Sequence, residues 1–135
     1  MAPPLIHAVR AKTAAAGTAI LDAPPGTACP VVSTVRGATF LLLVTEPTPF
    51  GLHDLKLTVD MVRELHIPFG VLVNRVGSGD DRVHVFCRQE GIPILLEIPD
   101  DRRIAEAYSR GKLIVEALPE YRNLFIKLAE KLLAD

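Results

Sequence analysis

The chain has 135 residues, of which 49% are hydrophobic, and a formal net charge of −1 at pH 7. This length predicts a single domain with its own core, and the interspersed charges argue against a nucleic-acid surface or a polybasic membrane anchor. No apolar run is long enough to span a bilayer, and Met1 to Pro4 lack the features of a secretory signal. Two cysteines outside any Cys-x-x-Cys motif, Cys29 and Cys87, suit a reducing compartment, so we expect a cytoplasmic protein.

The first part of the chain predicts a helix, a buried strand and a turn. The alanine-rich segment 5–16 is typical of a helix, and the apolar run 18–22 is typical of a strand. Pro24, Pro25 and Gly26 then predict a turn, because proline cannot continue a sheet ladder and glycine adopts backbone conformations that other residues resist. A short helix over 31–36 follows.

The rest of the chain alternates between apolar runs and amphipathic segments. Buried strands are expected at 39–45, 69–74 and 92–98. Helices are expected at 51–66, from 80 or 81 to 90, at 102–110, and from Pro119 onward, with 113–116 irregular. Four strands that alternate with helices predict an α/β fold of three layers, α/β/α, with a mostly parallel sheet.

Each predicted strand ends in polar or special residues. Since the carboxyl ends of parallel strands open at one edge of a sheet, these residues predict a ligand site there: Asp22, Thr45 and Glu46, Asn74 and Arg75, and Pro99 and Asp100. A carboxylate in this position, such as that of Asp22, suits a hydrated magnesium ion or a water molecule beside a phosphate.

Three segments carry a resemblance to a known family. They are Asp-Ala-Pro-Pro-Gly-Thr (22–27), Val-Thr-Glu-Pro-Thr-Pro-Phe-Gly (44–51) and Val-Asn-Arg (73–75), in that order. The sequence from residue 6 onward resembles the MinD/ParA class of P-loop ATPases, in particular the subgroup with an inserted ferredoxin-like, iron–sulfur domain. The resemblance implies a P-loop NTPase-like fold, and that 1–135 is a single domain corresponding to the C-terminal part of such a protein.

The phosphate-binding loop of that family is missing. The chain contains no Gly-x-x-x-x-Gly-Lys-Ser/Thr motif, whose backbone amides and lysine hold the phosphates. In the family, the strand before this loop lies between the strands that correspond to 18–22 and 39–45. Either these two strands pair directly or another chain fills the gap, so we expect a homo-oligomer or a missing N-terminal half.

The resemblance implies roles for residues on the phosphate side. Asp22 would act on the water shell of magnesium and on the attacking water, and the backbone at Gly26 and Thr27 would sense the γ-phosphate. A strand-end aspartate that caps the next turn, and a turn built for its geometry, are the simpler alternatives.

On the base side, Asn74 would read adenine, and Pro99 and Asp100 would pack around the base. The alternatives are an asparagine that ends a strand and an aspartate, at 100 or 101, that caps a helix. Arg75 would either stack on the base or be solvated.

The function predicted is that of a nucleotide-binding part of a MinD-like ATPase coupled to iron–sulfur or redox chemistry on a partner protein. Binding of ATP or ADP with magnesium is expected to be weak or absent in this chain, which by itself holds no cluster and is inactive. Two alternatives stay open: an iron–sulfur carrier of the Mrp type, which would need Cys29 or Cys87 from two chains, and a non-catalytic dimerisation module.

Overall fold

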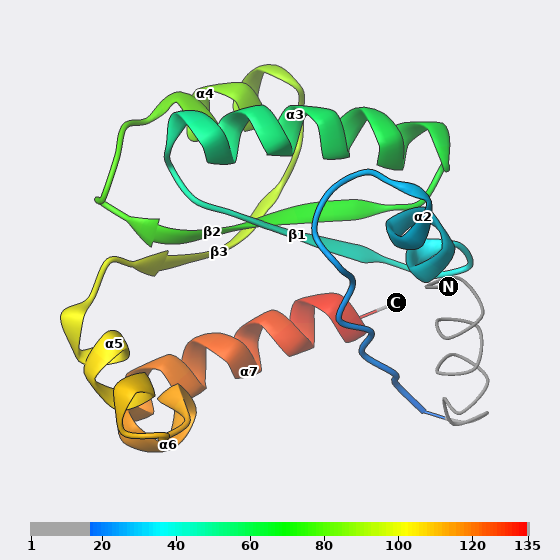
Figure 1. Cartoon of the computed structure of the whole chain (residues 1–135). Helices are drawn as coiled ribbons and strands as arrows, with labels where there is room; N and C mark the ends of the chain where they lie inside the picture. Colours follow the sequence, from blue (N-terminus) through cyan, green and yellow to red (C-terminus); the bar gives the residue numbers. More distant parts are fainter. Residues whose placement is uncertain (1–16, 135) are drawn as a thin grey trace.

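A three-stranded parallel sheet forms the centre of the molecule. The computed structural model describes residues 17–134, and its strands are β1 (Leu41–Thr45), β2 (Phe69–Val76) and β3 (Ile94–Pro99), in the order β1-β2-β3 (Figure 1). Leu41 lies opposite Phe69, and Val71 lies opposite Ile94. The predicted α/β fold with a parallel sheet is confirmed, whereas the predicted helix over 5–16 lies outside the described residues.

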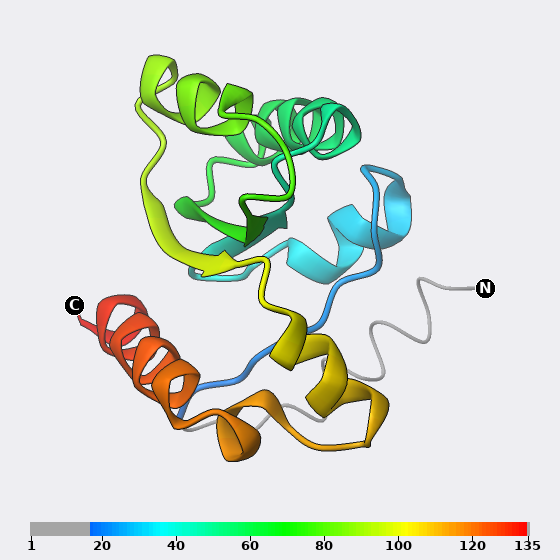
Figure 2. The same ribbon diagram turned by 90° about the vertical axis from the view of Figure 1, so that its left-hand side faces the viewer.

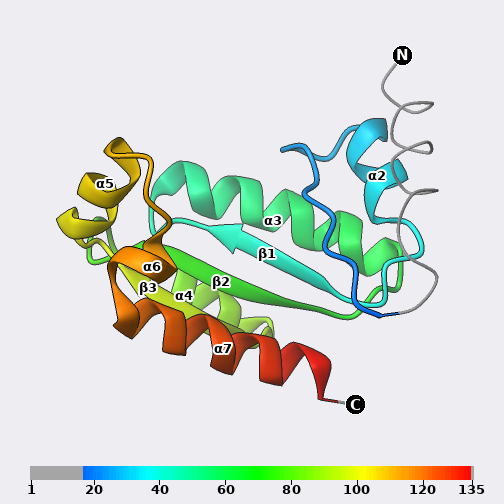
Figure 3. The same ribbon diagram turned by 90° about the horizontal axis from the view of Figure 1, so that it is seen from below.

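Helices cover both faces of this sheet. On one face lie α3 (Pro49–Glu64) and α4 (Arg82–Gln89), and on the other lie α5 (Arg102–Ser109), α6 (Ile114–Ala117) and α7 (Pro119–Leu133) (Figures 1 and 2). The remaining helix, α2 (Cys29–Val35), lies at the end of the sheet opposite α5 (Figure 3). The three predicted layers are therefore present.

The central strand β2 supplies side chains to two cores. Val71 and Val73 are fully buried and pack with residues of α3 and α4, including Val59. Leu72, between them, packs with residues of β3 and α7, including Leu128. Successive side chains of a strand point to opposite faces, so an uninterrupted apolar run is what a strand covered on both faces requires.

The predicted strand at 18–22 is wrong. This segment is an irregular stretch that leads to α2, and the side chain of Ile20 is 92% exposed. An apolar run becomes a strand when a neighbour pairs with it, and in the described part of the chain β1 pairs with β2 alone. Within residues 17–134, no strand pairs with the outer edge of β1, which we call its open edge, and Val44 on this strand is 65% exposed.

A second difference concerns 113–116, which was expected to be irregular. The short helix α6 forms there, and the Leu113 carbonyl accepts hydrogen bonds from the amides of Glu116 and Ala117. Ile114 packs against the core on the α7 face, which favours an ordered turn. The other predicted helices and strands in 29–134 are confirmed, with boundaries within two residues, except for the end of α7. No helix within 17–134 has both the length and the apolar character needed to cross a membrane.

Candidate functional site at the carboxyl edge of the sheet

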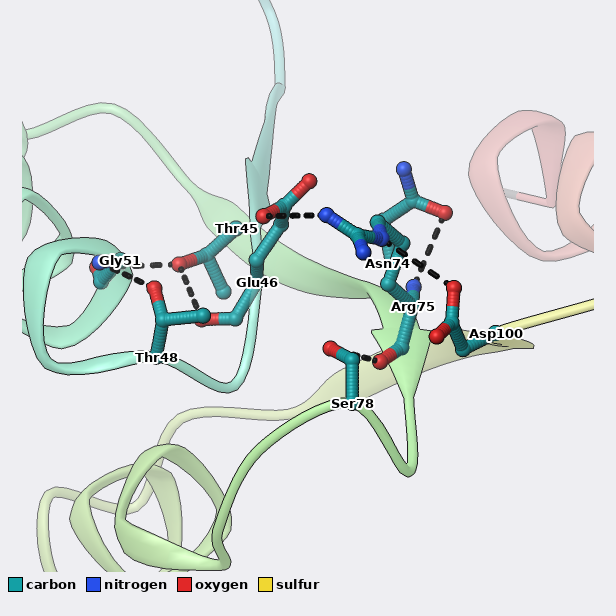
Figure 4. Close-up of polar contacts among 8 residues, drawn as sticks. All are labelled: Thr45, Glu46, Thr48, Gly51, Asn74, Arg75, Ser78 and Asp100. Atoms are coloured by element: carbon teal, nitrogen blue, oxygen red, sulfur yellow. Dashed lines mark hydrogen bonds and ion pairs between the residues drawn. The ribbon is translucent and has the colours of Figure 1, made fainter. Parts of the chain in front are cut away.

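The ends of all three strands are joined by Arg75. Its guanidinium lies 3.2 Å from the Asp100 carboxylate, measured from Nε to Oδ1, and 3.6 Å from Glu46, measured from Nη1 to Oε2 (Figure 4). These contacts raise the pKa of Arg75, first through the hydrogen bond to Asp100 and then through the two negative charges. We call Glu46, Asn74, Arg75, Pro99 and Asp100 the strand-end cluster.

Arg75 is held in an unusual backbone conformation. Its φ is 56°, in the left-handed region that non-glycine residues seldom adopt. The Ser78 hydroxyl donates to the Arg75 carbonyl at 2.7 Å, and the Arg75 amide donates to Oδ1 of Asn74 at 3.0 Å. Such conformations persist where the surroundings fix them, and they concentrate at functional sites. The Arg75 backbone is therefore fixed by its neighbours, whereas its side chain is 52% exposed and stays open to solvent.

Asn74 presents a hydrogen-bond donor. Because its Oδ1 accepts from the next backbone amide, the side-chain NH₂ group is directed away from Arg75 (Figure 4). A carboxamide NH₂ is a donor that matches the ring nitrogen acceptors of a purine. The side chain is half-buried at the end of β2, so it is fixed in place but accessible.

The end of β3 completes the cluster. Pro99 pairs in register with Val76, and the Asp100 amide donates to the Val76 carbonyl at 2.9 Å. The alternative in which Asp100 caps α5 is not observed. Asp101 is the N-cap, and it accepts from the Arg103 amide at 2.9 Å. Asp100 is thereby left to pair with Arg75.

Asp101 also fixes α7 to this turn. Its carboxylate accepts from the hydroxyl of buried Tyr121 at 2.8 Å and pairs with Arg103, which in turn reaches Glu120 at 2.8 Å. The side chain of Arg103 foremost, then the Tyr121 hydroxyl and the Arg103 amide, hold the pKa of Asp101 well below its ordinary value. This network connects the loop after β3 to the start of α7.

The loop after β1 is closed by hydrogen bonds around Gly51. Thr45, which is buried, donates to the Gly51 carbonyl at 3.0 Å, and the Gly51 amide donates to Oγ1 of Thr48, the N-cap of α3 (Figure 4). A Cβ on Gly51 would lie 2.2 Å from the Glu46 carbonyl oxygen. Only glycine permits this approach, which places Glu46 within reach of Arg75.

A second glycine joins this loop to the one after β2. A Cβ on Gly79 would lie 1.7 Å from the carbonyl oxygen of Pro47, which also accepts from the Asp80 amide at 3.1 Å. Neither Gly51 nor Gly79 was identified as a site residue from the sequence. The sequence does contain a signal for each: Gly51 lies near the start of a predicted helix, and Gly79 belongs to a Gly-Ser-Gly loop.

The residues predicted for the phosphate side do not join the cluster. Asp22, Gly26 and Thr27 lie in the segment 17–28, which passes β1 and leads to α2 (Figure 3). Asp22 and Thr27 are exposed and make no hydrogen bond or ion pair within 17–134. Gly26 has a φ of 96°, in keeping with the predicted turn. Of the predicted site residues, the structure brings together Asn74, Pro99 and Asp100.

The cysteines do not form a metal site with other residues of the part of the chain that the structure describes. Cys87 is 1% exposed in the core between α3, α4 and β2, and burial raises the pKa of its thiol, which disfavours the thiolate that binds iron. Cys29 is exposed at the start of α2. The residues in 17–134 include no group of three or more His, Cys, Asp or Glu placed to hold a metal ion. An iron–sulfur cluster would therefore need ligands from elsewhere besides Cys29.

Comparison with known proteins gives the fold a counterpart. The structure superposes on the MinD cell division protein of Aquifex aeolicus with a TM-score of 0.74 and 18% sequence identity, over 99% of this chain and 60% of that one. The fold is thus that of a MinD-like α/β protein.

The sequence is similar to longer proteins. It is 31% identical over 130 residues to the iron–sulfur cluster carrier protein of Aquifex aeolicus, covering 84% of this chain and 36% of the carrier. It is 37% identical over 105 residues to an uncharacterized protein of Methanocaldococcus jannaschii, covering 78% of this chain and 34% of that protein. The chain thus spans about a third of the length of these relatives. No family model matches the sequence.

Proposed function

We propose that this chain is the base-binding part of a MinD-like, nucleotide-dependent protein that acts on iron–sulfur clusters. The observation that carries the proposal is the strand-end cluster, in which the Asn74 amide and Asp100 are fixed on adjacent strand ends by Arg75. The MinD-like fold and the similarity to an iron–sulfur cluster carrier protein support it.

The cluster suits adenine better than it suits phosphate. Asn74 offers a donor to a ring nitrogen, while Glu46 and Asp100 place negative charge beside Arg75 and leave little net attraction for an anion. The sequence lacks the glycine-rich loop that would hold the phosphates. We therefore propose weak binding through the base, with Asp22 as the residue for the magnesium water shell when a phosphate-binding segment is present.

Nuclear magnetic resonance titration of the whole ¹⁵N-labelled chain tests this proposal. Adenosine and ATP should shift the amide signals of residues 74, 75 and 100 with dissociation constants in the millimolar range, and guanosine should bind more weakly. Asn74→Ala should weaken adenosine binding at least five-fold, whereas Asn123→Ala, an exposed asparagine on α7, should leave it unchanged. Equal binding by Asn74→Ala and the unmodified chain would refute the base site. Micromolar ATP binding would refute the proposal that this chain lacks a site for the phosphates.

A second candidate function is cluster carriage by paired chains. It is favoured by the exposure of Cys29, which leaves this thiol accessible to a second chain. Anaerobic reconstitution with iron and sulfide should then give charge-transfer absorption in the visible range that Cys29→Ser abolishes and Cys87→Ala retains. A colourless product from the unmodified chain excludes this candidate.

We further propose that another strand covers the open edge of β1, supplied by a second copy or by a missing N-terminal half. All but the last of its residues, Leu41–Thr45, are apolar, and the strand carries neither the charge nor the proline that usually protects an edge. Its exposed Val44 supports a missing neighbour.

A further inference from the structure

A hollow of about 270 Å³ lies beside α5 and α6, outside the strand-end cluster. Its lining includes three cations, Arg103, Arg110 and Lys112, and one carboxylate, Glu106. Apolar side chains, among them Ala107 and Leu118, form the rest of its wall. These residues belong to α5, the turn after it and the end of α6, which lie together in Figure 2.

The charges in this hollow are not balanced. Glu106 forms an ion pair with Arg102, with 3.2 Å between Oε1 and Nε. Arg103 forms ion pairs with Asp101 and Glu120. Arg110 and Lys112 have no ion pair with any residue in 17–134. Two uncompensated positive charges therefore line one small hollow.

The position of these cations suits an anion. A basic side chain just after a helix can stabilise the carboxyl end of that helix. This effect would explain either Arg110 or Lys112, but it does not require that both line the same hollow as Arg103. Like charges held close together repel, and the repulsion is relieved when an anion binds between them.

The volume limits the size of the ligand. Pockets for drug-sized molecules occupy about 300–1,000 Å³, so a hollow of about 270 Å³ lies just below this range and suits a molecule smaller than a drug. We propose that it binds a small anion with a carboxylate or phosphate group, held by Arg110 and Lys112, with the rest of the molecule against Ala107 and Leu118. This site is separate from the proposed base site at Asn74.

Titration of the ¹⁵N-labelled whole chain with inorganic phosphate and with succinate, at constant ionic strength, tests the site. Saturable shifts are expected at residues 103–118. Tighter binding of succinate assigns a carboxylate ligand and tighter binding of phosphate assigns a phosphate ligand; either result supports the site. The double variant Arg110→Gln/Lys112→Gln should bind at least ten-fold more weakly.

The matched control is Arg122→Gln/Lys127→Gln, which removes the same charge from exposed positions on α7 and should bind like the unmodified chain. Lys112→Gln alone should weaken binding at least three-fold. Because Lys112 lies on an exposed turn, this variant tests the site even if the double variant misfolds. Shifts that do not saturate, or equal losses in the double variant and the control, overturn the proposal. Adenosine carries no anionic group, so its binding reports on Asn74 independently.

Discussion

Arg75 reaches from the end of β2 to Asp100 at the end of β3, with 3.2 Å between Nε and Oδ1, and so holds two neighbouring strand ends together. Glu46 on the far side, 3.6 Å away, extends this contact to β1. One side chain thereby contacts all three of the loops in which we place the base site.

Replacing Arg75 by alanine should weaken adenosine binding three- to ten-fold, because the loops on either side of Asn74 lose their common partner. Arg75→Gly should lose the same binding but be more stable than Arg75→Ala, since glycine tolerates a φ of 56°. The control is Arg82→Ala, which removes an arginine whose partner, Asp80, is two residues away. NMR titration and thermal melts give both readouts, and an equal loss of binding in Arg82→Ala would contradict the role of Arg75.

The Asp101 carboxylate should govern stability in acid. Its pKa is lowered in the folded state, so its contribution is complete above its unfolded pKa of about 4 and is lost as the pH falls below that value. Asp101→Asn should therefore melt at a lower temperature than the unmodified chain at pH 7, and the difference should shrink between pH 4 and pH 2. Circular dichroism melts measure this, with Asp60→Asn as the control for net charge. A difference independent of pH would contradict the prediction.

Loss of the Tyr121 hydroxyl should also destabilise the fold. The hydroxyl donates to Asp101 at 2.8 Å from a buried ring, so Tyr121→Phe should cost about 1 kcal/mol at neutral pH. Burial and then the hydrogen bond to Asp101 raise the pKa of Tyr121. Its contribution is therefore present below the unfolded pKa of about 10 and lost as the pH rises through the higher folded value. Urea unfolding at pH 7 and pH 11 should show the larger difference at pH 7.

The two cysteines should differ in reactivity. Cys29 is exposed, whereas Cys87 is buried and the pKa of its thiol is raised, so only Cys29 should react with a thiol reagent in the native protein. Dithionitrobenzoate at pH 8 should release one equivalent rapidly and the second only after unfolding in guanidinium. Cys29→Ser should abolish the rapid phase; its persistence would show that Cys87 is accessible.

The open edge of β1 should govern self-association or pairing with a second polypeptide. Val44→Lys places a charge on this edge and should reduce any oligomer of the chain to monomers, because a lysine opposes the addition of a strand. Sedimentation velocity measures the change. Leu57→Lys, at an exposed apolar position on α3, is the control and should keep the mass of the unmodified chain. An oligomer that survives Val44→Lys would show that its interface lies elsewhere.

Most of the fold could be predicted because its segments carry their own periodic patterns. The apolar run of β2 and the spacing of Leu55, Val59 and Val62 on α3 are local features that the sheet and helices require. The run 18–22 carries a similar pattern but is exposed, because a strand also needs a neighbour, and composition does not reveal whether one is present.

The site was predicted less completely than the fold. Strand ends gave Asn74, Pro99 and Asp100, since loops after parallel strands meet at one edge. Which of Asp100 and Asp101 caps α5 could not be decided, because adjacent aspartates have equal propensity for a cap. The central position of Arg75 depends on partners 29 and 25 residues away, Glu46 and Asp100, and no local pattern encodes such contacts.

The approach of Gly79 to Pro47 has a consequence for variation at this position. Since a Cβ would lie 1.7 Å from the Pro47 carbonyl oxygen, even alanine would push the loops after β1 and β2 apart. The displacement would carry Glu46 away from Arg75 without altering either residue. A single methyl group would thus be enough to separate the loops that carry Glu46 and Arg75.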